Sequence, residues 1–436
     1  MMVDSKKAIS LDRVILFFLV IMPVVESLNG FLLGHHISDI YRAGLGLLIL
    51  MYIFCTGKYL YKQSFELLFL LLLYVGLTVF QFVFFHGDIT ALKSDLKTTT
   101  RIIITPLYYA YFYVALIRGD LKKDELVKLL TTYSILYAML IIVPTLFHTG
   151  YITYDYQGTG FVMMGHGTGV GSKGFFVEIN SLVGILVIFT FYTGQRALAF
   201  FKRGNLKNGM QFLLILLSLV ASEIITTTKT GIVVGVIYLI YFLPRSYFVL
   251  RRVINKKQRR ILAELLTVLV VVFSPFIYQG LAKEVTLFIQ RNQYFFDLFD
   301  GNLVKFITSS RSAFLEKTLK SVNKADNPLF LHLFGGGYYI KLDKPFFGAG
   351  RRVTEMDWFD LYFSYGLVGI VAYVTYFKES LFNLISSKKN PVKIMLIVFI
   401  VYSLIAGHVI FNAMTTTILA VALAYFTDDK FGENDD

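Results

Sequence analysis

Long apolar runs recur along almost the whole of this chain and constrain its fold more than any other feature. Many extend over roughly 18 to 22 residues, the length that a helix needs to cross about 30 Å of hydrocarbon. Hydrophobic residues occupy 56% of the 436 positions and charged residues only 16%, which differs from the usual composition of soluble globular domains. The sequence therefore predicts an all-α, polytopic integral membrane protein.

We expect about twelve spans, at residues 11–28, 39–56, 66–85, 98–117, 126–147, 176–194, 209–222, 230–243, 261–280, 358–377, 392–409 and 413–426. The seventh and eighth are short, and their connector, Glu223 to Thr228, could equally be a break at membrane depth. This pattern predicts a transmembrane bundle of about nine helices, a large extracellular loop with an amphipathic helix, further C-terminal spans and a cytoplasmic tail, over residues 1–280, 281–357, 358–427 and 428–436.

The net charge of +13 is best explained by membrane topology rather than by binding to nucleic acid. With the N-terminus in the cytoplasm, 25 Lys and Arg residues fall on cytoplasmic segments and 6 on short external ones. Both termini are then cytoplasmic, and a plasma membrane is the expected location. The single cysteine, Cys55, can form no internal disulfide and belongs to no metal-binding motif.

A candidate anion site lies in the large loop, in the segment SRSAFLEKTLKSV from Ser310 to Val322. The segment predicts an amphipathic helix that is capped by Ser310, with Arg311 near the centre of its apolar face. A planar guanidinium in that position suits a bidentate phosphate. The alternative is an arginine that snorkels or pairs with a neighbouring carboxylate.

A second charged cluster precedes the tenth span, where Arg351, Arg352, Glu355 and Asp357 are expected at the external membrane surface. The structural alternative is a capping box between Thr354 and Asp357, with acids that complement the helix dipole. Such a box explains one acid well, but two acids and two arginines less well.

More polar residues are expected at the same external level. Singly, each is more simply a helix cap or an interfacial anchor, but together they could line a groove for a lipid-linked anion. They are Arg101, Lys173, Glu178, Asn180, Glu223, Lys229 and His408. The Gly169–Gly174 segment matches G-x-G-x-x-G but opens no βαβ unit, and His35 and His36 lack metal-ligand spacing. The sequence predicts neither a metal nor another cofactor.

Four stretches of the chain resemble the O-antigen ligase and polymerase superfamily, which includes the Wzy-type polymerases of capsule and exopolysaccharide pathways. They are Gly171–Phe176 with Asn180, Thr226–Gly231, Ser310-Arg311 leading to Leu333–Gly337, and Glu355–Asp357 leading to Tyr365–Gly369. Their order and spacing cover about two thirds of the chain. The resemblance implies a GT-C-like membrane enzyme that handles oligosaccharides linked through diphosphate to a polyprenol, without a metal, on the outer face of the membrane.

The resemblance also implies roles for the candidate residues. Arg311 would bind the diphosphate, with Lys173 or Arg101 as second cations, and Asp357 or, failing that, Glu355 would accept the proton of the attacking hydroxyl. Lys229, Arg351, Arg352 and Asn180 are further candidates for substrate binding. Lys173 and Lys229 stand where many members have arginine, and Asp357 stands near a frequent histidine.

Three functions remain open at this stage. A Gram-positive repeat-unit polymerase would use polyprenyl-diphosphate oligosaccharide as donor and acceptor, with a chain-length regulator and a flippase as possible partners. A ligase of the same superfamily would transfer finished glycan to a lipid, wall polymer or protein. A flippase or transporter would require charges deep in the spans, whereas here most spans have apolar middles.

Overall fold

The computed structural model describes residues 11–33, 35–55, 62–87, 89–155, 162–164, 169–253, 286, 289–290, 292–340, 354–405, 407 and 409–427. The regular structure of this part is almost entirely helical, and the one sheet is a two-stranded ribbon. Among the described residues, eight helices are long and apolar enough to cross a membrane. These findings confirm the prediction of an all-α polytopic membrane protein.

These eight helices all lie within residues 11–253. They are α1 (Leu11–Phe31), α2 (Ile37–Cys55), α3 (Lys62–Phe84), α4 (Ile89–Ile117), α5 (Lys123–Leu146), α6 (Ile179–Lys202), α7 (Leu206–Ile225) and α8 (Lys229–Val253). The expectation that the seventh and eighth spans are short was wrong, because α7 and α8 have 20 and 25 residues and only a tight turn joins them. The polar residues at the ends of α7 and α8 are helical, but they do not contribute to the apolar runs from which the spans were predicted.

Further described elements are α10 (Leu303–Ile307), α11 (Arg311–Asn323), α12 (Pro328–Phe334), the 3₁₀ turn η1 (Gly337–Tyr339), α13 (Asp357–Tyr376), α14 (Lys378–Ser386), α15 (Pro391–Ile405) and α16 (Ala413–Ala424). The predicted tenth span corresponds to α13, which is interrupted at Gly366. The eleventh and twelfth correspond to α15 and α16, with 15 and 12 residues. The ninth, at 261–280, lies outside the described residues, so the total of twelve stays a prediction.

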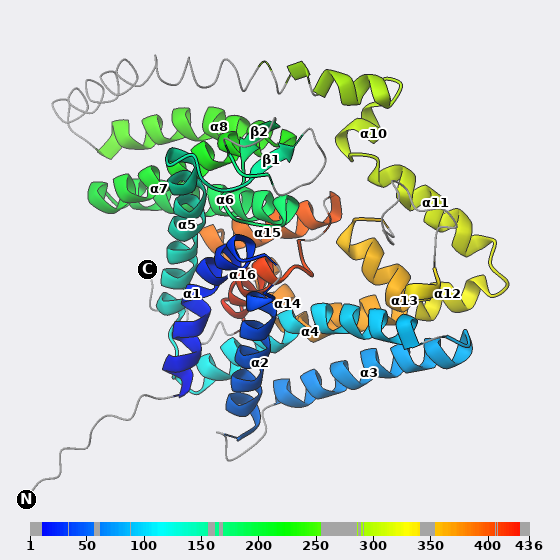
Figure 1. Ribbon diagram of the computed structural model, residues 1–436. Helices are drawn as coiled ribbons and strands as arrows, with labels where there is room; N and C mark the ends of the chain where they lie inside the picture. Colours follow the sequence, from blue (N-terminus) through cyan, green and yellow to red (C-terminus); the bar gives the residue numbers. More distant parts are fainter. Residues whose placement is uncertain are drawn as a thin grey trace, which may run out of the picture.

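Helix α16 lies in the middle of the bundle and contacts both α4 and α6 (Figure 1). Helix α6 packs against α7, α8 and α15, and α4 packs against α16, α2 and α3. The most apolar window of α6 is 78% buried, whereas that of α8 is only 22% buried. Because apolar surface on the outer helices can face lipid, this difference places α6 inside the bundle and α8 at its margin.

Two glycine-rich segments meet where α13 is broken. Gly366 has a left-handed φ of 68°, and a Cβ at this position would overlap the Leu333 carbonyl of α12. The amide of Gly336 donates to the Phe363 carbonyl at 2.9 Å, and Gln81 of α3 donates to the carbonyls of Phe334 and Ser364. The glycines therefore let the turn after α12 dock against the α13 backbone, and this fixes α12 relative to the membrane helices.

Candidate functional site

The four sequence stretches that carry the resemblance are joined in space by contacts, one of which runs through α10. Gly171 lies so close to the turn at Thr226 and Thr227 that a Cβ there would overlap the Thr227 hydroxyl. Lys229 donates from Nζ to the Phe306 carbonyl at 2.9 Å, just before Arg311 in the chain. Arg311 in turn lies 3.8 Å from Glu355, measured from Nε to Oε2. The stretches thus form one connected region, although they are far apart in sequence.

Arg311 is the most distinctive cation of this region. It is the first residue of α11, and Ser309 and Ser310 before it both have left-handed φ values, of 51° and 69°. Only 11% of the Arg311 side chain is exposed, and its Nε has no hydrogen-bond partner among the described residues. A largely buried guanidinium with an unused donor is suited to an anionic ligand, because burying a charge without compensation is costly.

The amphipathic character of α11 is confirmed, but the predicted cap is not. Phe314 and Val322 are buried, and Lys320 on the opposite face pairs with Glu316 in solvent. Ser310 occupies the N-cap position, yet its side chain accepts no capping hydrogen bond. The left-handed backbone at Ser310 turns its side chain away from the first free amides, and the Thr308 hydroxyl accepts from the Ser312 amide instead.

The acids before α13 also differ from the expected capping box. Thr354 does not pair with Asp357; its amide and its hydroxyl both donate to Asp360 Oδ1, at 2.8 and 2.6 Å. Asp357 is only 3% exposed, and its Oδ2 accepts the amides of Val409 and Ile410 at 2.8 and 2.6 Å. Asp360, one turn further into the helix, therefore binds Thr354 in place of Asp357, and Asp357 binds another segment.

That other segment is the connector between α15 and α16. A Cβ at Gly407 would overlap the Glu355 backbone, so the connector touches both acids of the cluster. Trp358 Nε1 donates to the Ser403 hydroxyl at 2.9 Å and fixes the end of α15 beside the start of α13. Glu355 itself has a left-handed φ of 57°, and its side chain is 15% exposed beside Arg311. The connector therefore sets where both carboxylates lie.

Lys173 and Asn180 flank the start of α6. The ribbon of β1 (Ile152–Asp155) and β2 (Gly169–Ser172) ends at Lys173, which is 5% exposed and donates from Nζ to the Val177 carbonyl at 3.3 Å. Burial lowers the pKa of the Lys173 ammonium, and the Glu178 carboxylate partly opposes this shift. Asn180 lies in the first turn of α6 and is half-buried. No strand was expected here, and the G-x-G-x-x-G match is mostly this short strand.

The remaining candidates are not all brought to Arg311. The Lys229 ammonium lies 4.2 Å from the centre of the Phe306 ring as well as bonding its carbonyl, so Lys229 holds α10 against α8. Arg101 is exposed on α4, and no hydrogen bond or ion pair links it to Arg311 within the described ranges. Arg351 and Arg352 lie outside the described residues, as does His408.

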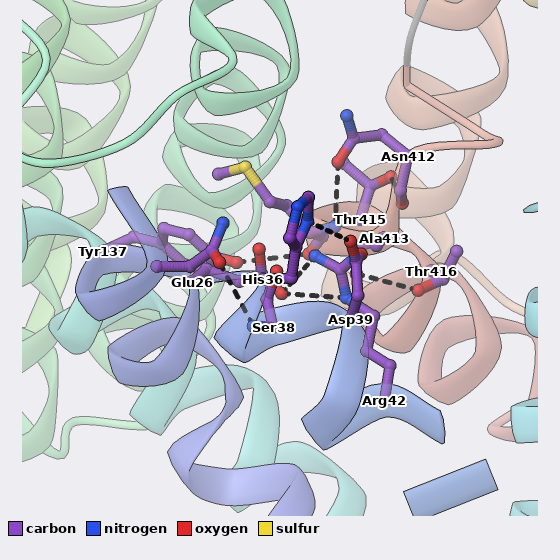
Figure 2. Close-up of polar contacts among 12 residues, drawn as sticks. Glu26, His36, Ser38, Asp39, Arg42, Tyr137, Asn412, Ala413, Thr415 and Thr416 are labelled. Atoms are coloured by element: carbon purple, nitrogen blue, oxygen red, sulfur yellow. Dashed lines mark hydrogen bonds and ion pairs between the residues drawn. The ribbon is translucent and has the colours of Figure 1, made fainter. Parts of the chain in front are cut away.

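Sequence reasoning overlooked a buried ion pair between α1 and α2 (Figure 2). Arg42 donates to Glu26 Oε1 from Nε at 3.0 Å and from Nη2 at 2.5 Å, and Glu26 is 6% exposed. The pair lies near the start of α16, where the Tyr137 hydroxyl donates to the Met414 carbonyl at 3.1 Å. The sequence feature that could have indicated this ion pair is an acid near the end of one apolar run and an arginine near the start of the next.

Within the residues that the structure covers, no group of three or more His, Cys, Asp or Glu side chains could hold a metal ion.

One comparison with known protein families bears on the site, and it covers a segment in the second half of the chain. Residues 288–429 match the sequence model of the family described as O-antigen ligase like membrane protein. The matched segment contains Arg311, Glu355 and Asp357, and it supports the resemblance to the ligase and polymerase superfamily. No curated protein and no solved structure matches the chain.

Proposed function

We propose that this protein is a glycosyltransferase that joins polyprenyl-diphosphate-linked oligosaccharide units on the outer face of the plasma membrane. The observation that carries the proposal is Arg311, a largely buried guanidinium with an unpartnered Nε and a carboxylate at 3.8 Å. This pair offers a binding group for a diphosphate and, beside it, an acceptor for a proton. Both lie in the segment that matches the O-antigen ligase like family.

The reaction we propose is a single displacement. A hydroxyl oxygen of the acceptor sugar attacks the anomeric carbon of the donor, and the bond from that carbon to the diphosphate oxygen breaks. The polyprenyl diphosphate leaves as an anion whose new charge is stabilised by Arg311. Glu355 accepts the proton of the attacking hydroxyl, and the anomeric configuration inverts.

We assign the base role to Glu355 before Asp357 because of how the two carboxylates are held. Both hydrogen bonds that Val409 and Ile410 donate end on Asp357 Oδ2, in a site that is only 3% exposed. Glu355 lies at ion-pair distance from Arg311 without a hydrogen bond to it. In this proposal Glu355 accepts the proton once a diphosphate has taken over the guanidinium, and Asp357 positions the connector.

The same region carries groups suited to the rest of such a substrate. Lys173 is a buried second cation, and Asn180 begins the helix that follows it. The apolar residues Leu303, Val304 and Ile307 of α10 are about 60% exposed beside Lys229, as expected of a surface that contacts lipid chains. A flippase would deliver the lipid-linked unit, and a chain-length regulator would limit the product.

The test uses purified protein in lipid nanodiscs with polyprenyl-diphosphate-linked repeat units, and the products are separated by size. We expect a ladder that rises in single repeat units. Arg311→Ala should lower the rate by about 10² to 10³, and Arg311→Lys should recover only part of it because lysine keeps the charge but loses the planar fork. Near-normal turnover by correctly inserted Arg311→Ala protein would show that the diphosphate is bound elsewhere.

A ligase is the second candidate, and the description of the matched family favours it. The same preparation separates the two functions when a finished lipid-linked glycan is supplied with a lipid, wall-polymer or protein acceptor. One transfer per acceptor, with no ladder from repeat units alone, would identify a ligase. Intact substrate with neither product would contradict both glycosyltransferase assignments.

A further inference from the structure

Tyr402 lies at the level of the candidate site but has no role in the mechanism so far. It stands near the end of α15, next to Ser403, whose hydroxyl accepts from Trp358 Nε1 at 2.9 Å. Trp358 in turn follows Asp357 in α13. These two adjacencies place Tyr402 at the same height in the bundle as the acids before α13.

The Tyr402 ring is held on the face of α6 that also carries Asn180. A Cβ at Gly184 would lie 2.9 Å from Tyr402 Cε1 and 3.6 Å from Val409 Cγ1, so the missing side chain at Gly184 lets the ring approach the helix. Asn180 is one turn earlier on that face, because residues four apart are neighbours on a helix. The Val409 amide donates to Asp357 Oδ2 at 2.8 Å, which connects the ring to the acid cluster.

The Tyr402 hydroxyl is unlike those of many other half-buried or buried tyrosines in this protein. Those hydroxyls form hydrogen bonds with groups of neighbouring helices, as at Tyr74, Tyr109, Tyr137, Tyr365 and Tyr376. The half-buried Tyr402 donates to no described residue. The ionisable groups that act electrostatically on its hydroxyl belong to Arg311, Tyr154, Glu223 and Asp357, from four different elements.

We propose that the Tyr402 hydroxyl donates a hydrogen bond to a phosphate oxygen of the lipid-linked diphosphate that Arg311 binds. The proposal rests on the proposed function and adds a substrate-contacting residue to it. A hydroxyl that lies among ionisable groups and has no acceptor in the described part of the chain is a preorganised donor. A hydrogen bond to a charged group contributes enough that its loss should weaken diphosphate binding about 10- to 100-fold.

The test measures direct binding of polyprenyl diphosphate, without turnover, to purified wild-type protein and to Tyr402→Phe. Tyr247→Phe is the matched control, because that tyrosine is 52% exposed on α8 and loses the same atom. We expect the control to bind as the wild type does and Tyr402→Phe to bind about 10- to 100-fold more weakly, with an unchanged thermal unfolding midpoint. Gly184→Ala, which displaces the ring but keeps the hydroxyl, should weaken binding in the same direction.

The outcomes separate this proposal from the proposed function. If Arg311→Ala abolishes diphosphate binding while Tyr402→Phe stays within about twofold of the wild type, the role of Tyr402 is refuted and the diphosphate site stands. If Tyr402→Phe cannot be purified and Gly184→Ala binds normally, the role is refuted as well. If the wild-type protein binds no polyprenyl diphosphate, both proposals are wrong.

Discussion

Replacing Asp357 distinguishes a carboxylate that accepts a proton from one that holds the backbone. Its Oδ2 accepts two buried amides, those of Val409 and Ile410. In Asp357→Ala both amides lose their acceptor, and each buried orphan costs about 1 to 3 kcal/mol, or about 2 to 6 kcal/mol together. In Asp357→Asn the amide oxygen can still accept both bonds, and only the extra strength of a charged acceptor is lost, about 1 kcal/mol for each bond.

The assay combines glycan transfer in nanodiscs with hydrogen exchange of the connector amides at residues 409–412. We expect Asp357→Ala to exchange faster at these amides and to lose most transfer, because both Gly407 and the α16 start would move. Asp357→Asn should retain native-like protection and at least about a thirtieth of the transfer rate, since the loss of about 2 kcal/mol over the two bonds corresponds to about 30-fold in rate.

The same pair of measurements can refute this reasoning. If Asp357→Asn keeps native protection but loses 10² or more in rate, the carboxylate itself performs chemistry and Asp357 is the base. Glu355→Gln provides the complementary comparison, because it should abolish transfer with connector protection unchanged. An active Glu355→Gln enzyme would remove Glu355 from the mechanism.

Three further predictions follow from other contacts. Gly407→Ala should lower transfer by at least tenfold in a folded bundle, because its Cβ would overlap the Glu355 backbone; Gly76→Ala, whose added Cβ would meet nothing within 4 Å, tests whether any glycine loss has this effect. Lys229→Met loses a hydrogen bond of 2.9 Å and a cation–π contact to Phe306, so α10 should detach from α8 and limited proteolysis near residue 305 should increase several-fold. Unchanged cleavage would mean that Lys229 does not hold α10. Because burial lowers the pKa of Lys173, the unfolded chain binds more protons than the native state between that pKa and about 10.5. The thermal unfolding midpoint of the wild type should therefore rise with pH through this window relative to that of Lys173→Met. If the unfolding midpoints of the two proteins change with pH in parallel, the burial argument is contradicted.

The membrane helices were predictable because their main requirement is local. Each span needs a continuous apolar segment of sufficient length, and that requirement appears directly in the chain. The ends were less accurate because helices such as α7 and α8 continue beyond the apolar segment. Residues such as Lys207 and Asn208 are helical at an exposed end although they contribute nothing to a hydropathy window.

The candidate site was predictable in its residue types but not in its pairings. Arg311 stood out because a cation was centred on an apolar face, a pattern contained within one helix. The partners of Asp357 are two backbone amides in a distant connector, and backbone groups leave no signature in a sequence. Asp360 and Asp357 are equally plausible partners of Thr354 by residue type, and only the tertiary contact with Val409 decides between them.

Left-handed backbone at residues other than glycine links the fold to the proposed chemistry. Glu355, Ser310, Ser309 and Thr227 all have φ values between 51° and 69°, and each lies in or beside one of the joined stretches. Such conformations cost about 1 to 3 kcal/mol each and persist only where the surroundings enforce them. Here the enforcing contacts are visible, because Gly407 packs on the Glu355 backbone and Gly171 packs on Thr227. Glu355 therefore lies in a strained segment, and Arg311 begins α11 directly after another, so their separation depends in part on the packing of Gly407 against the Glu355 backbone.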